Sequence, residues 1–352
     1  MQLPAHIDIS ASLPDYEIPA FRLIKNELNQ VRELINNQLS SQVFDFLERN
    51  RSGQKRVATD IDQLFEYVRS RSGKMIRPGL VLLAGSCCGD ITDEHIRVAA
   101  MIEMIHNATL LHDDVIDQGQ RRRGQPTFNN LWGNESAVLM GDFILSRVFK
   151  LCAEIKPKLT KVIAAAAVRL CEGELKQIIQ RQNWQLSESE YIDVITEKSA
   201  VFFSSCCSIG AILARAGESQ IRSLSEFGLN AGVAFQIIDD LLDISGNEKV
   251  MGKNSGNDLN QCKLTLAVIH LLGTINDKEK NTIINSYLEG NKTLKDRIRF
   301  AAILKRSGSL GYAHSRAQDF VEKAIRALDE FEKNNAKISL IETAKFMANR
   351  SA

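Results

Sequence analysis

Apolar residues recur every three or four positions along much of this chain, which is the spacing of one face of an α-helix. The clearest stripe lies near the N-terminus and consists of Phe21, Ile24, Leu28, Val31, Ile35, Leu39 and Val43. Three later segments, 96–116, 201–213 and 227–244, are apolar on most of their faces, as expected for helices at the centre of a large bundle. From Ile275 onward, charged and apolar positions alternate, which predicts peripheral helices.

Helix breakers are rare. The last of six prolines is Pro157, so the following 195 residues contain none, and the alternating pattern of half-buried strands is missing. Short polar or glycine-rich joints lie at 50–54, 119–124, 246–256 and 306–311, and each is too short to link two domains. The pattern predicts an all-α, single-domain bundle of about a dozen helices over residues 1–352, with residues 1–50 as an N-terminal helical extension.

Composition narrows the class of protein. Hydrophobic residues make up 44% of the 352 residues and charged residues 25%, as in an ordinary globular protein. Lys and Arg together number 44 against 43 for Asp and Glu, so the basic excess of a nucleic-acid-binding surface is missing. No apolar run reaches the roughly 18 residues of a membrane span. The first 20 residues contain Asp8, Asp15 and Glu17 but neither Lys nor Arg, unlike a signal or transit peptide. We expect a cytoplasmic protein without a transmembrane segment.

Cysteine usage agrees with that location. The seven cysteines include two adjacent pairs, Cys87–Cys88 and Cys206–Cys207, and no Cys-x-x-Cys spacing. Zinc sites and disulfide frameworks use other spacings. We therefore interpret these residues as small buried thiols in a reducing compartment.

A first aspartate cluster ends one of the central segments. Asp113 and Asp117 are four residues apart and share one helix face, with Asp114 beside them. Like charges at this spacing repel, and the apolar neighbours add a cost of desolvation. A divalent cation would relieve both costs, and Mg²⁺ takes one or two carboxylates together with phosphate and water oxygens. An N-terminal helix cap or a solvated turn is the alternative for a single cluster.

A second cluster repeats the spacing. Asp239, Asp240 and Asp243 also stand at the polar end of an apolar segment. Two facing clusters of this kind would hold several Mg²⁺ ions between them, and a diphosphate is the natural ligand of such a cage.

Basic residues accompany both clusters. Arg121, Arg122 and Arg123 follow the first one, and Lys253 and Lys263 follow the second. Arginine suits bidentate contacts with phosphate, although a solvated basic loop is the alternative for the arginine run. Lys74 and Arg77 stand where a helix is predicted to start, an end that favours anions.

Together these segments resemble the trans-isoprenyl diphosphate synthase family, whose members make farnesyl, geranylgeranyl and longer polyprenyl diphosphates. The resemblance extends from about Gly73 to Leu328. Its motifs are Gly-Lys-x-x-Arg-Pro at 73–78, Ile-Glu-Met-Ile-His at 102–106, the first aspartate cluster, Arg-Arg-Gly-x-Pro-Thr at 122–127, Gly-Asp at 141–142, Glu-Gly-Glu at 172–174, Lys-Ser at 198–199 and Phe-Gln-Ile-x-Asp-Asp-x-Leu-Asp at 235–243. It implies the isoprenoid synthase fold, in which the helices surround a central cavity.

The resemblance also implies roles for individual residues, position by position. Lys74, Arg77, His106 and Arg123 would bind the diphosphate of isopentenyl diphosphate. Arg122, Lys198, Ser199, Gln236, Lys253 and Lys263 would hold the allylic diphosphate, farnesyl or a similar one. Asp113, Asp117 and Asp239 would ligate about three Mg²⁺ ions, with Asp114, Asp240 and Asp243 in support. Taken alone, a histidine such as His106 in an apolar helix is more often a core residue.

Helical spacing suggests what sets the product length. A chain growing from Asp113 toward the start of its helix would pass Thr109, Ala108, Ile105 and Met101. In the family, short-chain enzymes place an aromatic residue at or beside the position of Ala108, and here both Ala108 and Thr109 are small. Met101 lies 12 residues before Asp113, about 18 Å at about 1.5 Å per residue.

These features predict a medium- to long-chain, octaprenyl-like product made by ionisation, condensation and elimination. The alternatives are a geranylgeranyl-type shorter-chain synthase and a non-catalytic subunit of a heteromeric synthase. A terpene cyclase is disfavoured, because such enzymes normally lack the second aspartate repeat. The resemblance further implies a homodimer, and we expect a peripheral membrane contact for release of the product.

Overall fold

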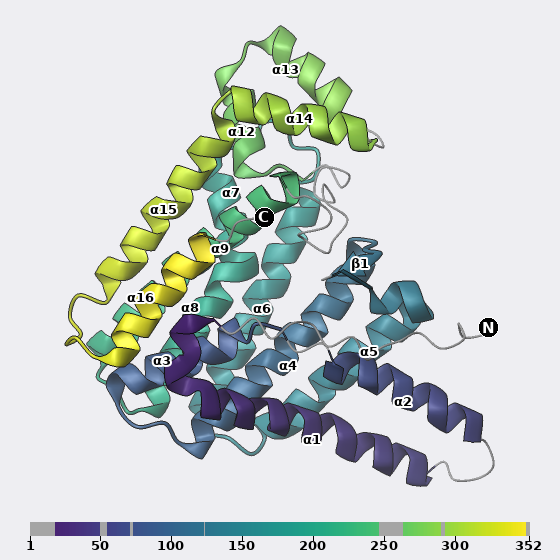
Figure 1. Ribbon diagram of the computed structural model, residues 1–352, viewed down its shortest axis with the longest axis vertical. Helices are drawn as coiled ribbons and strands as arrows, with labels where there is room; N and C mark the ends of the chain where they lie inside the picture. Colours follow the sequence, from purple (N-terminus) through teal and green to yellow (C-terminus); the bar gives the residue numbers. More distant parts are fainter. Residues whose placement is uncertain are drawn as a thin grey trace.

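The computed structural model describes residues 18–49, 55–70, 73–122, 124–245, 263–289 and 293–349, with helices in every one of these ranges (Figure 1). The first half comprises η1 (Pro19–Ile24), α1 (Lys25–Arg49), α2 (Lys55–Ser70), α3 (Ile76–Cys88), α4 (Asp93–Ile116), β1 (Arg121–Arg122), β2 (Gln125–Pro126), α5 (Phe128–Cys152) and α6 (Pro157–Ile179). The second half comprises α7 (Glu188–Ile195), η2 (Thr196–Ala200), α8 (Val201–Leu213), α9 (Glu218–Ser245), α12 (Leu266–Thr274), α13 (Asp277–Ile283), η3 (Ile284–Leu288), α14 (Leu294–Arg306), α15 (Ser309–Ala327) and α16 (Asn335–Ala348). The all-α prediction is confirmed.

The N-terminal stripe is buried as its spacing predicted. Six of its seven members lie in the core: Phe21, Ile24, Leu28, Val31, Ile35 and Leu39. The side chain of Val43 lies outside the described part of the structure. The first turn is the 3-10 helix η1 rather than α-helix, and Pro19 at its first position supplies a backbone angle suited to starting a helix.

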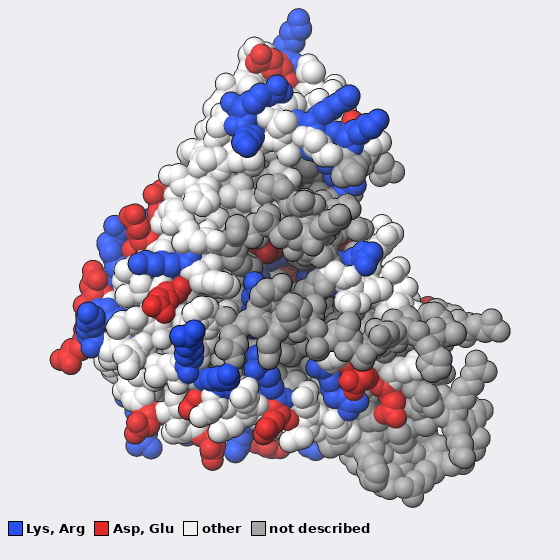
Figure 2. All heavy atoms as spheres, viewed as in Figure 1, with Lys and Arg blue, Asp and Glu red and all other residues white. Residues whose placement is uncertain are grey.

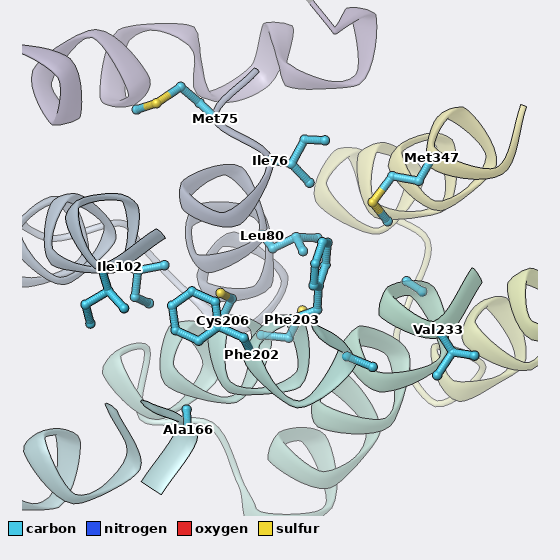
Figure 3. Close-up of a cluster of buried hydrophobic side chains, with 14 of the residues drawn as sticks. Met75, Ile76, Leu80, Ile102, Ala166, Phe202, Phe203, Cys206, Val233 and Met347 are labelled. Carbon is cyan, nitrogen blue, oxygen red and sulfur yellow. The ribbon is translucent and has the colours of Figure 1, made fainter. Parts of the chain in front are cut away.

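The centre of the bundle is formed by α3, α4, α8 and α9. Figure 3 shows Leu80 of α3 above Phe203 and Cys206 of α8, with Ile102 of α4 to one side. Gly210 lets α8 approach α3 closely, because a β-carbon there would lie 2.1 Å from the carbonyl oxygen of Val81. The apolar segments are therefore central, as predicted.

The prediction that all helices after Ile275 are peripheral is wrong for the last two. Ala313 and Ala317 of α15 are fully buried, and α15 packs along α9. On α16, Leu340 and Met347 are also fully buried, and Figure 3 shows Met347 beside the central cluster. The small alanines allow close helix packing, while charged positions of α15 such as Glu322, Lys323 and Arg326 are exposed. None of the helices in the described ranges is both long and apolar enough to cross a membrane.

The joint predicted at 119–124 carries β1, which forms a short two-stranded hairpin with β2. β1 and β2 are antiparallel, and Arg122 pairs with Gln125. The hydroxyl of Thr127 closes its base by donating to the carbonyl of Gly119 at 2.7 Å. The hairpin turns the chain back toward the end of α4 and so brings Arg122 to the aspartates.

Candidate active site

The first aspartate cluster lies at the C-terminal end of α4. Asp113 and Asp114 are in its last turn, and Asp117 is its C-terminal cap. Asp114 is buried, and one of its carboxylate oxygens accepts hydrogen bonds from Nε of Arg122 at 2.9 Å and from an Nη of the same guanidinium at 2.8 Å. The buried charge of Asp114 is thus compensated by an arginine that the sequence had assigned to diphosphate binding.

The second cluster lies near the same arginine. Burial lowers the pKa of the Arg122 guanidinium, but the negative charges of Asp114, Asp113 and Asp239 outweigh that effect and hold the pKa above its ordinary value. Arg122 therefore lies within electrostatic reach of both clusters. Figure 2 shows acidic and basic atoms together in a hollow near the middle of one face of the molecule.

Two further cations approach Asp117. The ammonium of Lys263 lies 3.0 Å from Oδ1 of Asp117, and a guanidinium nitrogen of Arg181 lies 3.7 Å from the same oxygen. Lys263 lies just before α12, so this ion pair joins the start of α12 to the end of α4. Sequence reasoning had no signal for Arg181.

Lys198 lies on the short π-helix η2, between α7 and α8. Its ammonium contacts Oε2 of Glu174 and Oε1 of Gln177, each at 2.6 Å. Gly173 permits this contact, because a β-carbon there would lie 2.2 Å from the backbone nitrogen of Lys198. A π-turn within a helix is frequently found at functional sites. Glu174 belongs to a motif noted in the sequence, whereas Gln177 had no signal.

Asp113 is surrounded by both signs of charge. Burial raises the pKa of its carboxyl to about 6, Lys198 and Arg122 lower it, and Glu174 and Asp117 raise it further. The net effect is a carboxylate that lacks enough compensating positive charge, so an additional cation beside it would be favourable.

A chain of hydrogen bonds links η2 to the second cluster. The hydroxyl of Ser199 donates to Oε1 of Gln236 at 2.7 Å, and Nε2 of Gln236 donates to Oδ1 of Asp240 at 2.9 Å. The hydroxyl of Tyr191 donates to the other oxygen of Asp240 at 2.6 Å. Ser199 and Gln236 were predicted site residues, while Tyr191 was missed because a single tyrosine in α7 gives no pattern. Asp243, one turn further along α9, is buried.

The residues assigned to isopentenyl diphosphate also come together. Nη1 of Arg77 lies 3.1 Å from Nε2 of His106, and because guanidinium nitrogens only donate, His106 accepts at that atom. The Arg77 guanidinium lies over the ring of Phe203, at 4.6 Å from its centre. Lys74 lies over the ring of Phe346 in α16. Two other predicted residues, Arg123 and Lys253, lie outside the described residues.

The residues assigned to product length line one face of α4. Met101 and Ala108 are fully buried, and Ile105 is almost so. Thr109 is half-buried, and its hydroxyl donates to the carbonyl of His106. The four therefore face the interior of the bundle below Asp113.

The carboxylates fit a divalent cation that arrives with its substrate. Within the described ranges, no three Asp, Glu, His or Cys side chains converge closely enough to hold a metal ion by themselves. Mg²⁺, however, is usually held by only one or two carboxylates and completes its coordination with phosphate oxygens and water. Asp113 lacks enough compensating positive charge, and both Asp113 and Asp239 act electrostatically on Arg122, so these carboxylates provide such donors.

A helical bundle that gathers carboxylates and cations from α4, α6, α9 and η2 around one hollow has the architecture of an isoprenoid synthase. The family model for polyprenyl synthetase matches residues 58–303, and this chain belongs to that family. Members of the family are prenyltransferases, and dependence on Mg²⁺ is their general property.

Individual relatives cover most of the chain. It is 36% identical to an octaprenyl diphosphate synthase of Haemophilus influenzae over 83% of this chain and 88% of that protein. It is 32% identical to a short chain isoprenyl diphosphate synthase of Methanothermobacter thermautotrophicus over 81% and 89%. A crystal structure of a polyprenyl synthase from Caulobacter crescentus, complexed with calcium and isoprenyl diphosphate, has a TM-score of 0.85 and 30% identity, covering 95% of this chain and 97% of that one.

Proposed function

We propose that this protein is an all-trans polyprenyl diphosphate synthase that joins isopentenyl diphosphate units head to tail onto an allylic diphosphate, and that its product is of medium to long chain length. The whole chain would act as one synthase domain. Similarity alone leaves the chain length open, since the relatives include both an octaprenyl and a short chain enzyme. A geranylgeranyl-type product is the second candidate, favoured by that short chain relative.

The observation that carries the long-chain proposal is Ala108. It is fully buried on α4, five residues before Asp113, on the same face as Ile105 and Met101. A methyl group here blocks far less of the path below the aspartates than an aromatic ring would. The growing chain would extend past Ala108 toward Met101, over roughly 10 Å at about 1.5 Å per residue.

Each group of residues receives a role in this proposal. Lys74, Arg77, His106 and Arg123 would bind isopentenyl diphosphate. Arg122, Lys198, Ser199, Gln236, Lys253 and Lys263 would bind the allylic diphosphate. Asp113, Asp117 and Asp239 would hold about three Mg²⁺ ions. The retention of both clusters and of these cations supports an active enzyme over a non-catalytic subunit.

Catalysis would depend on positively charged groups that are already fixed around the diphosphate before its bond to carbon breaks. Bound Mg²⁺ would supply Lewis-acid stabilisation of the diphosphate. Arg122, Lys198 and Lys263 would donate to the departing diphosphate as the allylic carbon–oxygen bond breaks, and these donors gain strength as negative charge develops. Arg77 and His106 would orient isopentenyl diphosphate so that its double bond attacks the allylic cation. The proton lost afterwards would go to the released diphosphate. The apolar wall below Asp113 would exclude water from the cation.

We further propose that the enzyme is a cytoplasmic homodimer. The described cysteines are all free thiols, which suits a reducing compartment, although of these only Cys206 and Cys207 are buried as predicted and Cys171 is exposed. On α6 an apolar stripe with alternating steps of four and three is solvent-exposed and consists of Ala164, Val168, Cys171, Leu175 and Ile178. Such a stripe suits packing against the same stripe of a second copy. Leu175→Glu should convert a dimer into a monomer in sedimentation experiments, and a dimer in that variant would contradict this surface.

The decisive experiment is product analysis. The purified protein is incubated with isopentenyl diphosphate, farnesyl diphosphate and Mg²⁺, and the products are dephosphorylated and separated by chromatography. We expect prenyl alcohols longer than geranylgeraniol. A geranylgeranyl product would support the second candidate, and the absence of any product from the purified chain would support a non-catalytic subunit.

A further inference from the structure

Tyr191 is buried against the second aspartate cluster. It lies on α7, which precedes the π-helix η2, and only 3% of its surface is exposed. Its hydroxyl hydrogen bond to Oδ2 of Asp240 measures 2.6 Å, in the range of charge-assisted O–H···O⁻ bonds. A buried phenol aimed at a carboxylate in the active site restrains that carboxylate.

The other oxygen of Asp240 is restrained from the opposite side. Nε2 of Gln236 donates to Oδ1 of Asp240, and Ser199 donates to Oε1 of Gln236. The bond from Ser199 fixes the orientation of the Gln236 amide, so its NH₂ group must point to Asp240. Both oxygens of Asp240 are therefore held by protein donors from two different elements.

The helix that carries Tyr191 is itself anchored. Glu188, one turn before Tyr191, accepts hydrogen bonds from the hydroxyl of Tyr312 and, at 2.7 Å, from Nε of Arg316, both on α15. The ring of His270 on α12 stacks on Tyr312. Thus α7 is fixed to α15 at one turn and to Asp240 on α9 at the next.

We propose that Tyr191 is a positioning residue for the metal–diphosphate site. Tyr191 would hold Asp240 in place, and Asp240 would orient Asp239 rather than serve as a metal ligand. Held by Tyr191 and Gln236, Asp240 would fix the rotation of this turn of α9 and thereby the direction of Asp239. The charge of Asp239 acts on Arg122, which itself contacts Asp114 of the first cluster. This inference rests on the proposed function, because it concerns how that site binds metal and diphosphate.

The test removes one oxygen atom. Tyr191→Phe keeps the buried ring and deletes the hydroxyl. We expect the apparent dissociation constant of Mn²⁺, measured by electron paramagnetic resonance with inorganic pyrophosphate present, to rise about tenfold, as for other partners that orient a ligand. The Mg²⁺ concentration for half-maximal rate should rise in parallel, while KM for isopentenyl diphosphate should stay within about twofold.

Tyr312→Phe is the matched control. It also deletes a tyrosyl hydroxyl bonded to a carboxylate and also loosens α7, but it leaves Asp240 untouched. We expect its Mn²⁺ affinity to equal that of the unsubstituted protein. An equal loss in both variants would overturn the proposal in favour of a general packing role for α7.

Asp240→Asn and the double variant complete the test. If the two residues work only as a hydrogen-bonded pair, Tyr191→Phe and Asp240→Asn should weaken Mn²⁺ binding to a similar extent. The double variant should then bind Mn²⁺ no more weakly than either single variant. Additive losses, or tighter Mn²⁺ binding in Tyr191→Phe, would identify Asp240 as a ligand and overturn the proposal. The Mn²⁺ measurement needs no turnover, so failure of the proposed synthase activity would be seen separately, as absence of prenyl products from the unsubstituted protein.

Discussion

Lys263 and Asp117 form a close ion pair across the active site, with the ammonium 3.0 Å from Oδ1 of the carboxylate and only 7% of the lysine side chain exposed. They are 146 residues apart in the sequence. The protein's own cations thus partly neutralise the first aspartate cluster. Binding of Mg²⁺ and diphosphate would have to redistribute these contacts, with the carboxylate turning to the metal and the ammonium to the phosphate.

Lys263→Met should therefore weaken binding of the allylic substrate. Hydrogen bonds to charged groups contribute about 1.5–3 kcal/mol, so we expect KM for farnesyl diphosphate to rise about 10- to 100-fold. KM for isopentenyl diphosphate should change little. Steady-state kinetics measures both values. Lys156→Met is the control, because it breaks an exposed ion pair with Glu94 at the surface. Equal effects on the two substrates would contradict the assignment of Lys263.

Asp113→Asn should separate activity from stability. We expect turnover to fall at least about 10²-fold, because a carboxylate that would hold Mg²⁺ at the diphosphate is lost. The pKa of the Asp113 carboxyl is raised from 3.8 to about 6, mainly by burial, so the native state binds its proton more tightly than the unfolded chain does. The stability contributed by this proton is present below about pH 4 and is lost as the pH rises through 6.

The asparagine variant avoids that loss. In EDTA, its melting temperature relative to the unsubstituted protein should therefore increase between pH 5 and pH 7.5, by roughly 2–4 °C. Differential scanning calorimetry at the two pH values measures the change. Asp90→Asn, at an exposed loop position, should show a constant difference. A difference for Asp113→Asn that is also independent of pH would show that this carboxyl is not desolvated.

Ala108→Phe should shorten the product. The ring would occupy the space on α4 below Asp113, so the chain should stop after fewer condensations. Chromatography of the dephosphorylated products measures its length. Ala99→Phe is the control, because Ala99 is equally buried but lies nine residues earlier, about 180° around the helix. Overpacking destabilises both variants by about 1–3 kcal/mol, but only Ala108→Phe should change the product. An unchanged product from Ala108→Phe would exclude this path.

Gly173→Ala should reduce the rate by displacing Lys198. The new β-carbon would lie 2.2 Å from the backbone nitrogen of Lys198, so α6 and η2 would have to separate and the ammonium would move from Glu174 and Gln177. A shift of about 1 Å in a positioning group can cost about 10²-fold in rate. In Gly311→Ala, an added β-carbon meets no atom within 4 Å, so this control should retain full activity and gain up to about 1 kcal/mol of stability. The rate constant of a single turnover, measured for Gly173→Ala and for Gly311→Ala, checks this prediction.

Much of the site was predictable because it uses local repeats. Asp113 and Asp117, and likewise Asp239 and Asp243, recur with the period of a helix, and their cost in apolar surroundings is visible from the neighbouring residues alone. Tyr191, Gln177 and Arg181 were not predictable, because each belongs to an ordinary polar or aromatic position and acquires a partner only through packing. The ion pairs of Arg122 with Asp114 and of Lys263 with Asp117 were also not predictable, because the resemblance assigned both cations to the diphosphate.

The sequence by itself determined the helical class, the central position of three apolar helices and the two carboxylate clusters, because helical periodicity and the cost of burying charge act over a few neighbouring residues. The tertiary structure alone decided that α15 and α16 contribute to the core, that Lys198 contacts Glu174, and that Tyr191 and Gln236 hold Asp240 from two sides. These contacts join residues far apart in the chain. Their distances depend on how closely whole helices pack, which small residues such as Gly173 and Gly210 permit and no local pattern reveals.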